Sequence, residues 1–111
     1  MTAITDEYMY SMLATTKSYC VVVLKAGRNI TSENAKKIIW EHGRRNFALR
    51  SEGKVAVVAP VTREGDIAGF YIFNTNEEEA IEIMNDDPAV KEGVFEFITY
   101  PCKSFPGDGL K

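Results

Sequence analysis

The chain of 111 residues has 45% hydrophobic and 26% charged residues, a composition that fits one compact domain and leaves no room for two. Thirteen Lys and Arg against sixteen Asp and Glu give a net charge of −3, so the chain lacks the basic excess of proteins that bind nucleic acid. One histidine and two cysteines are too few for a zinc site built from Cys and His alone. No apolar run approaches the roughly 18 residues of a membrane span, so no membrane partner is expected.

Residues 1–17 are predicted to form an N-terminal extension. Ile4, Tyr8 and Met12 recur at the spacing of one helical face, which predicts a docked helix near residues 5–15. Acidic residues precede the first Lys or Arg in this segment, which is not the pattern of a signal peptide, and a cytoplasmic location is therefore expected. At the other end, residues 106–111 contain Gly and Pro and are predicted to be a flexible tail.

The domain predicted over residues 18–105 opens with the run SYCVVVLK, whose alternating positions are apolar on both sides and indicate a strand buried on both faces. The Thr-Ser-Glu sequence at 31–33 predicts the start of a helix with an acid in its first turn. A stripe at helical period continues this helix to about residue 51, and Gly53 is the expected stop. The stripe consists of Ala35, Ile38, Ile39, His42, Asn46 and Leu49.

The second half of the domain predicts a hairpin, a helix and a last strand. The two strands of the hairpin are expected over residues 54–59, closed by Pro60, and 67–73. Asn76 is expected to cap a helix that ends at the Asn-Asp-Asp-Pro sequence 85–88, and a strand over 94–100 is closed by Pro101. The order is therefore βαββαβ, which predicts an α+β fold: a ferredoxin-like sandwich with two helices on one face of a four-stranded antiparallel sheet.

This arrangement predicts a homodimer. The strands carry apolar residues on both faces, whereas two helices can cover only one face of the sheet. An uncovered apolar face larger than a few hundred Å² marks an interface. We therefore expect two copies to pack through their sheet faces.

His42 is the first candidate for chemistry because it lies on the inward stripe of the first domain helix, where an imidazole is partly desolvated. The alternative is a core or interface histidine satisfied by a backbone carbonyl. Asp86 and Asp87 precede Pro88 at a predicted helix end, and an Asp-Pro sequence commonly starts a turn. The helix dipole disfavours carboxylates at a C-terminal end, which indicates that at least one of the two has a further role. If the two helices lie side by side, such a carboxylate could orient the imidazole.

The remaining candidates concern substrate and partners. Arg45, together with Arg44 and Arg28, is a candidate for meeting an anionic substrate, although scattered arginines commonly form a solvated face. Trp40 and Phe47 share a helix face that points away from His42 and are interpreted as packing for the N-terminal helix or another subunit. No GxGxxG or P-loop spacing is present, so no nucleotide or other cofactor is expected.

Several short motifs, in order, resemble the YCII-related (YciI-like) family of small dimeric α+β barrel proteins over roughly residues 18–105. They are His42, Gly53, Ala59-Pro60, Glu79-Ala80, Asp87-Pro88 and Gly93-Val94-Phe95. The family's usual Ala-Gly-Pro reads Val-Ala-Pro here, and the aromatic usual after Asp-Pro is Ala89. The resemblance implies a dimeric α+β barrel with His42 and Asp87 as the active-site pair, and Pro60 and Arg45 are taken as the substrate-contacting positions.

Three functions follow as hypotheses. In the first, the pair performs cofactor-independent acid-base chemistry, of isomerase or lyase type, on a small organic substrate. In the second, the space between helices and sheet binds a small molecule or haem, with His42 as a ligand or hydrogen-bond donor. In the third, the N-terminal helix and the Trp40/Phe47 face recruit a partner and no catalysis occurs.

Overall fold

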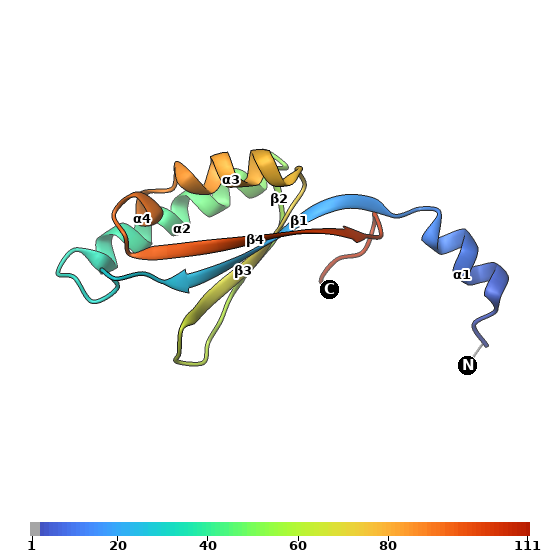
Figure 1. Ribbon diagram of the computed structural model, residues 1–111, viewed down its shortest axis with the longest axis horizontal. Helices are drawn as coiled ribbons and strands as arrows, with labels where there is room; N and C mark the ends of the chain where they lie inside the picture. Colours follow the sequence, from blue (N-terminus) through green and yellow to red (C-terminus); the bar gives the residue numbers. More distant parts are fainter. Residues whose placement is uncertain (1–2) are drawn as a thin grey trace.

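The computed structural model describes residues 3–111, so residues 1 and 2 of the predicted extension lie outside the described part. The eight elements follow one another as shown in Figure 1. In chain order they are α1 (Asp6–Leu13), β1 (Lys17–Ala26), α2 (Ala35–Ser51), β2 (Val55–Pro60), β3 (Ile67–Phe73), α3 (Glu77–Asn85), α4 (Pro88–Lys91) and β4 (Phe95–Ser104). The predicted α+β class and ferredoxin-like arrangement are confirmed. No helix within residues 3–111 has the length and apolarity needed to cross a membrane.

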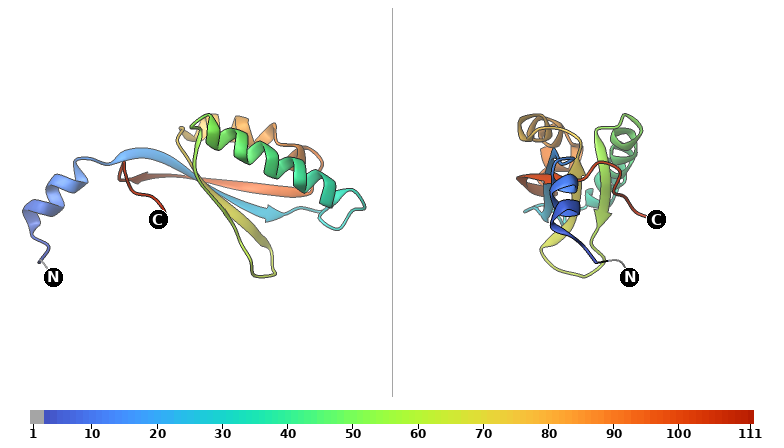
Figure 2. Two further views of the ribbon diagram at one scale, coloured as in Figure 1. Left: turned by 180° about the vertical axis from the view of Figure 1, so that it is seen from behind. Right: turned by 90° about the vertical axis from the view of Figure 1, so that its right-hand side faces the viewer.

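The four strands form one antiparallel sheet in the order β2-β3-β1-β4, with α2, α3 and α4 on one of its faces (Figures 1 and 2). β1 lies in the centre, where Val22 is opposite Tyr71 of β3 and Thr99 of β4. This register decides which side chains face the helices. Cys20, Val22 and Leu24 point toward them and are buried.

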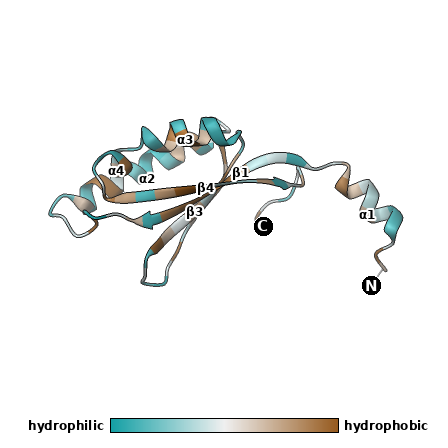
Figure 3. Ribbon diagram, viewed as in Figure 1, coloured by the Kyte–Doolittle hydropathy of each residue, from teal (hydrophilic) through white to brown (hydrophobic). Residues whose placement is uncertain are grey.

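The other face of the sheet carries two apolar rows that run across three strands. Val23 lies opposite both Phe70 and Ile98, and Val21 lies opposite both Ile72 and Tyr100. Phe70, Ile98 and Tyr100 are between 41% and 51% exposed. Figure 3 shows hydrophobic stretches along β3 and β4. The prediction that both sheet faces carry apolar residues is confirmed, and the face without helices remains accessible in the single chain.

The start of α2 and the end of β4 differ from the prediction, whereas the end of α2 agrees with it. α2 begins at Ala35 rather than at 31–33, because Ser32 first closes a turn by donating its backbone N–H to Asn29 and accepting from Ala35. β4 passes through Pro101 and ends at Ser104, which its position at the sheet edge permits because an edge strand tolerates a residue without an N–H. The stop at Gly53 is confirmed, with φ at +76°.

The predicted N-terminal helix exists, but the expectation that it docks on the domain is wrong. α1 is capped by the Thr5 side chain, which accepts a hydrogen bond from the Tyr8 N–H, and none of its residues is buried. Figures 1 and 2 show it beyond the end of the sheet, away from the other helices. Three residues join it to β1.

Candidate active site

His42 is held on the sheet-facing side of α2. Ala35, His42 and Leu49 are seven residues apart along the helix and are its three buried residues, so the predicted stripe is confirmed. The imidazole is 6% exposed, and its ring stands edge-on to Phe95 with the centroids 5.0 Å apart. The side chain therefore has an apolar floor from β4 and little freedom to turn.

Asp87 meets this imidazole from the other helical segment. Its Oδ2 atom lies 2.8 Å from Nδ1 of His42 and also accepts a hydrogen bond from the Ala89 N–H at 3.0 Å. Asp87 is 1% exposed and caps α4, a short helix that the sequence did not predict and that starts at Pro88. The expectation that Asp87 sits unfavourably at a helix end is therefore wrong, because its carboxylate satisfies an N–H at a helix start.

The neighbouring Asp86 has no part in this pair. Its side chain is 71% exposed, and its Oδ1 lies 2.9 Å from Nζ of Lys91. That hydrogen bond and the charge of Lys91 lower the pKa of Asp86. Of the two adjacent carboxylates, the structure brings only Asp87 to His42.

Arg45 lies behind the pair. Its guanidinium donates to the Ile83 carbonyl at 2.7 Å and lies 3.6 Å from Oδ1 of Asp87. Within residues 3–111, that Oδ1 atom accepts no hydrogen bond, so the nearby positive charge is its main compensation. Arg45 therefore faces Asp87 and does not line the cavity beside His42.

These surroundings determine the charge of Asp87. Burial acts to raise the pKa of Asp87, but the hydrogen bond and charge of His42, the Ala89 N–H and the charge of Arg45 together outweigh it and lower the pKa. Asp87 is thus a carboxylate at neutral pH. A carboxylate can only accept hydrogen bonds, so Nδ1 of His42 carries the proton between them.

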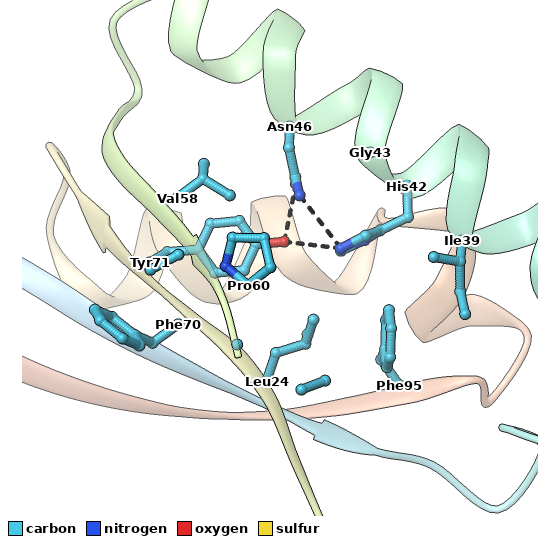
Figure 4. A pocket seen from close by; sticks show the side chains of 13 residues that line it. Leu24, Ile39, His42, Gly43, Asn46, Val58, Pro60, Phe70, Tyr71 and Phe95 are labelled. Carbon is cyan, nitrogen blue, oxygen red and sulfur yellow. Dashed lines mark hydrogen bonds between the residues drawn. The ribbon is translucent and has the colours of Figure 1, made fainter. Parts of the chain in front are cut away.

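The second ring nitrogen of His42 faces a polar triangle (Figure 4). Nε2 lies 3.2 Å from the Tyr71 hydroxyl and 3.3 Å from Nδ2 of Asn46, and the hydroxyl donates to Oδ1 of Asn46 at 2.8 Å. When the imidazole is neutral, Nε2 is an acceptor and the Asn46 amide donates to it. When the imidazole is protonated, the free lone pair of the Tyr71 oxygen can accept from Nε2. Nε2 of His42 therefore has a hydrogen-bond partner whether the imidazole is neutral or protonated.

Tyr71 remains a phenol. It is 2% exposed, and burial raises the pKa of its hydroxyl, with the negative charge of Asp87 as a further cause. Neither Tyr71 nor Asn46 was among the predicted site residues. Asn46 is four residues after His42 on the same stripe, a usable signal, whereas the contact of Tyr71 depends on the register of β3 against β1.

A cavity of about 240 Å³ adjoins the imidazole between α2 and the sheet (Figure 4). Its walls include Leu24, Ile39, Val58, Pro60 and Phe95, and among the described residues that line it none is Lys, Arg, Asp or Glu. Its polar groups come from His42, Asn46 and Tyr71. Of the two predicted substrate contacts, Pro60 is therefore in the wall and Arg45 is outside it.

The other surface candidates lie apart from this cavity. Trp40 and Phe47 lie on the side of α2 away from His42, as predicted, but they are exposed and do not pack against α1 of the same chain. Arg44 is exposed and pairs with Glu41 at 3.2 Å. Arg28 lies beside Gly93 near the end of β1.

Fold and site together define a small α+β protein with a buried histidine–carboxylate pair beside one apolar cavity. The sequence pattern of the YCII-related domain matches residues 9–102, and the chain belongs to this family. The match begins inside α1, earlier than the boundary at residue 18 that sequence motifs indicated. No curated protein matches the sequence.

Proposed function

We propose that this protein is a homodimeric enzyme that uses His42 and Asp87 for cofactor-independent acid-base chemistry, of isomerase or lyase type, on a small organic substrate. The observation that carries the proposal is the direction of the imidazole. Nδ1 is bound to a buried carboxylate, while Nε2 lies at the wall of an apolar cavity. A base needs a fixed tautomer and a second nitrogen that can face the substrate, and Nε2 serves as that nitrogen when the substrate takes the place of the Asn46 amide beside it.

In the proposed reaction, Nε2 of His42 takes a proton from a substrate C–H or O–H bond. The electron pair of that bond forms a double bond in the substrate, and the carboxylate of Asp87 stabilises the resulting imidazolium. In an isomerisation, an existing double bond of the substrate shifts its electron pair to a further atom as the new double bond forms, and Nε2 returns the proton to that atom. In an elimination, the new double bond forms as the bond from the neighbouring atom to a leaving group breaks. The leaving group departs with the electron pair of that bond, and the imidazolium gives its proton to that group or to water.

The cavity restricts the substrate. Since its described walls contain no charged side chain, the part of the substrate that enters is uncharged and mainly apolar. The Tyr71 hydroxyl and the Asn46 amide are the groups that can hold one polar substrate atom near Nε2. Pro60 contributes a rigid wall, and Arg45 acts through Asp87 as a positioning residue.

The proposed assembly is a dimer of sheet faces. The rows through Val21 and Val23 supply six apolar side chains on one open surface, too large a patch to lie in water without cost. Packing two such faces buries both patches and leaves α2 and the cavity side of each copy outward. The dimer is thus compatible with an accessible site in each copy.

Binding without turnover is the second candidate, and a specific observation favours it. Nε2 of His42 is already within hydrogen-bond distance of Tyr71 and Asn46, so the imidazole can be satisfied in the absence of a reaction. An apolar ligand of the cavity's size could bind there while these two hydrogen bonds of His42 remain in place. Haem would additionally need Nε2 as an axial ligand, which requires both partners to give way.

Proton exchange distinguishes the two candidates. We would incubate the protein in D₂O with a panel of small uncharged ketones, lactones and enol ethers and follow deuterium incorporation and double-bond migration by NMR. Enzyme action predicts exchange that is lost in His42→Gln and retained in Arg44→Gln, an exposed control on the same helix. Compounds that shift protein resonances but exchange no protons with any variant would support binding alone and contradict catalysis.

A further inference from the structure

Two exposed apolar surfaces of the chain carry side chains that the proposed reaction does not use. One is the arm, residues 4–13, which contains α1. The other is the α2 groove, a hollow of about 370 Å³ on the outer side of α2. The groove is lined by Lys36, Ile39, Trp40, Gly43, Arg44 and Phe47.

The arm is rich in exposed apolar side chains. Ile4, Tyr8, Met9, Tyr10 and Leu13 are all between 49% and 74% exposed, and no residue of α1 is buried. Isolated helices of this length are marginal in water, because helix stability in proteins comes mainly from packing. A helix of eight residues with this surface is therefore expected to pack against a partner surface.

The groove offers apolar walls to such a helix. Trp40 and Phe47, seven residues apart, are 70% and 67% exposed and form its two apolar walls. Gly43 lies between them and has no side chain, so a second helix can approach the α2 backbone there. Trp40 is about 160° around the helix from His42, given 3.6 residues per turn, so Trp40 points away from the sheet. The groove lies on the flank of α2 and shares Ile39 and Gly43 with the cavity beside His42.

The charges of the two surfaces are also complementary. The arm carries Asp6 and Glu7 in the first turn of α1, and no Lys or Arg occurs among residues 1–16. The groove is flanked by Lys36 and Arg44, and the Arg50 guanidinium lies 5.6 Å from the Phe47 ring centroid. An acidic apolar helix thus has a basic-rimmed apolar groove of matching chemistry in the same chain.

The junction between α1 and β1 indicates which copy the arm meets. The Thr15 and Thr16 side chains each donate to backbone carbonyls of the last turn, at 2.7 Å and 2.9 Å, and their N–H groups do the same. These four hydrogen bonds fix the helix to the start of the strand. Figures 1 and 2 show the arm directed away from α2 of its own chain.

We propose that the arm of one copy docks in the α2 groove of a second copy. Apolar side chains of α1 cover Trp40 and Phe47, and Asp6 and Glu7 meet Lys36 and Arg44 at the rim. The contact is distinct from the sheet-face dimer, because the groove is lined by residues of α2 and the open sheet face by residues of β1, β3 and β4. It does not depend on the proposed catalysis.

Trp40 is the single tryptophan of the chain, so its fluorescence reports on the groove directly. In the full chain, we expect rising protein concentration to move the emission to shorter wavelength and to lower the acrylamide quenching constant severalfold. The variant Met9→Ser/Leu13→Ser should keep the emission of the dilute protein at every concentration. Leu110→Ser, which removes a more exposed apolar side chain from the tail, should behave as the unmodified chain.

A charge exchange tests the rim. Lys36→Glu/Arg44→Glu should abolish the concentration-dependent change, and addition of Asp6→Lys/Glu7→Lys to the same chain should restore it. Circular dichroism verifies that each variant is folded, which is expected because all these positions are exposed. The proposal is overturned if acrylamide quenches Trp40 to the same extent in every variant and at every concentration. It is also overturned if Trp40 is protected from acrylamide at all concentrations, or remains protected in Met9→Ser/Leu13→Ser, because another segment would then occupy the groove.

Discussion

Nδ1 of His42 and Oδ2 of Asp87 lie 2.8 Å apart in the interior, although the two residues are 45 positions apart in the chain. One comes from the middle of α2, and the other caps the single turn of α4. The packing of α4 against α2 therefore sets the geometry of the pair. A change at either residue is expected to alter both the chemistry of the cavity and the stability of this helix contact.

Asp87→Asn should destabilise the protein by about 1–3 kcal/mol, the usual value of a hydrogen bond to a charged group. The amide cannot carry the negative charge that faces Arg45 and His42, although its oxygen can still accept one hydrogen bond. Urea unfolding at neutral pH measures this loss. Asp86→Asn is the matched control, since its side chain is exposed, and it should have little effect. Equal unfolding midpoints for the two variants would contradict a structural role for the pair.

The stability that Asp87 contributes should depend on pH in one direction. Its pKa in the folded protein is below the ordinary value of 3.8, so the folded state binds a proton less readily than the unfolded chain. The contribution is therefore fully present above that ordinary value and is lost as the pH falls through the lower pKa of the folded state. Unfolding free energies of the unmodified chain and Asp87→Asn should accordingly converge in acid.

Arg45→Gln should move this acid transition to higher pH. The guanidinium is one of the groups that lower the pKa of Asp87, and Gln retains a donor without the charge. The unmodified chain and Arg44→Gln, a neighbouring exposed arginine, should share the same transition. An unchanged transition in Arg45→Gln would show that Arg45 does not act on Asp87 and would remove it as a positioning residue.

Much of the fold was predictable because it rests on local patterns. Alternation of apolar residues indicates strands, and the seven-residue recurrence of Ala35, His42 and Leu49 identifies the inner face of α2. α4 escaped prediction because a helix of four residues is too short to show a period. Because α4 was not predicted, Asp87 was expected at the C-terminal end of the preceding helix, whereas it lies at the N-terminal end of α4.

The site was predictable only in part. The His42–Asp87 pair was found from an inward stripe together with a family resemblance, and the short distance between them agrees with it. The contact of Tyr71 needs the register of β3, which alternation alone does not define. The Arg45 side chain is turned toward Asp87 by its hydrogen bond to the Ile83 carbonyl. A contact with a backbone carbonyl does not depend on the type of residue at position 83, so the sequence could not predict it.

Tyr71 should be the last tyrosine to ionise. Burial and the charge of Asp87 raise the pKa of its hydroxyl, whereas exposed phenols ionise near pH 10. In an ultraviolet titration, one of the five tyrosines should therefore remain a phenol after the exposed ones have ionised. Tyr71→Phe should remove this delayed fraction, and Asp87→Asn should lower its pKa. A titration in which all five ionise together in the folded protein would contradict the buried hydrogen-bonded hydroxyl.

Ile98→Lys should convert the proposed sheet-face dimer into a monomer. Ile98 completes the row that runs through Val23 to Phe70, and a Lys there would place a charge in the centre of the interface. The side chain is 42% exposed in the single chain, so the domain itself should still fold. In chains that also carry Met9→Ser/Leu13→Ser, which removes the proposed arm contact, light scattering should give about twice the chain mass of 12.4 kDa without Ile98→Lys and the single mass with it. Glu82→Lys, which adds the same side chain on the exposed side of α3, should leave the mass unchanged. A single-chain mass for the unmodified protein at high concentration would exclude the dimer.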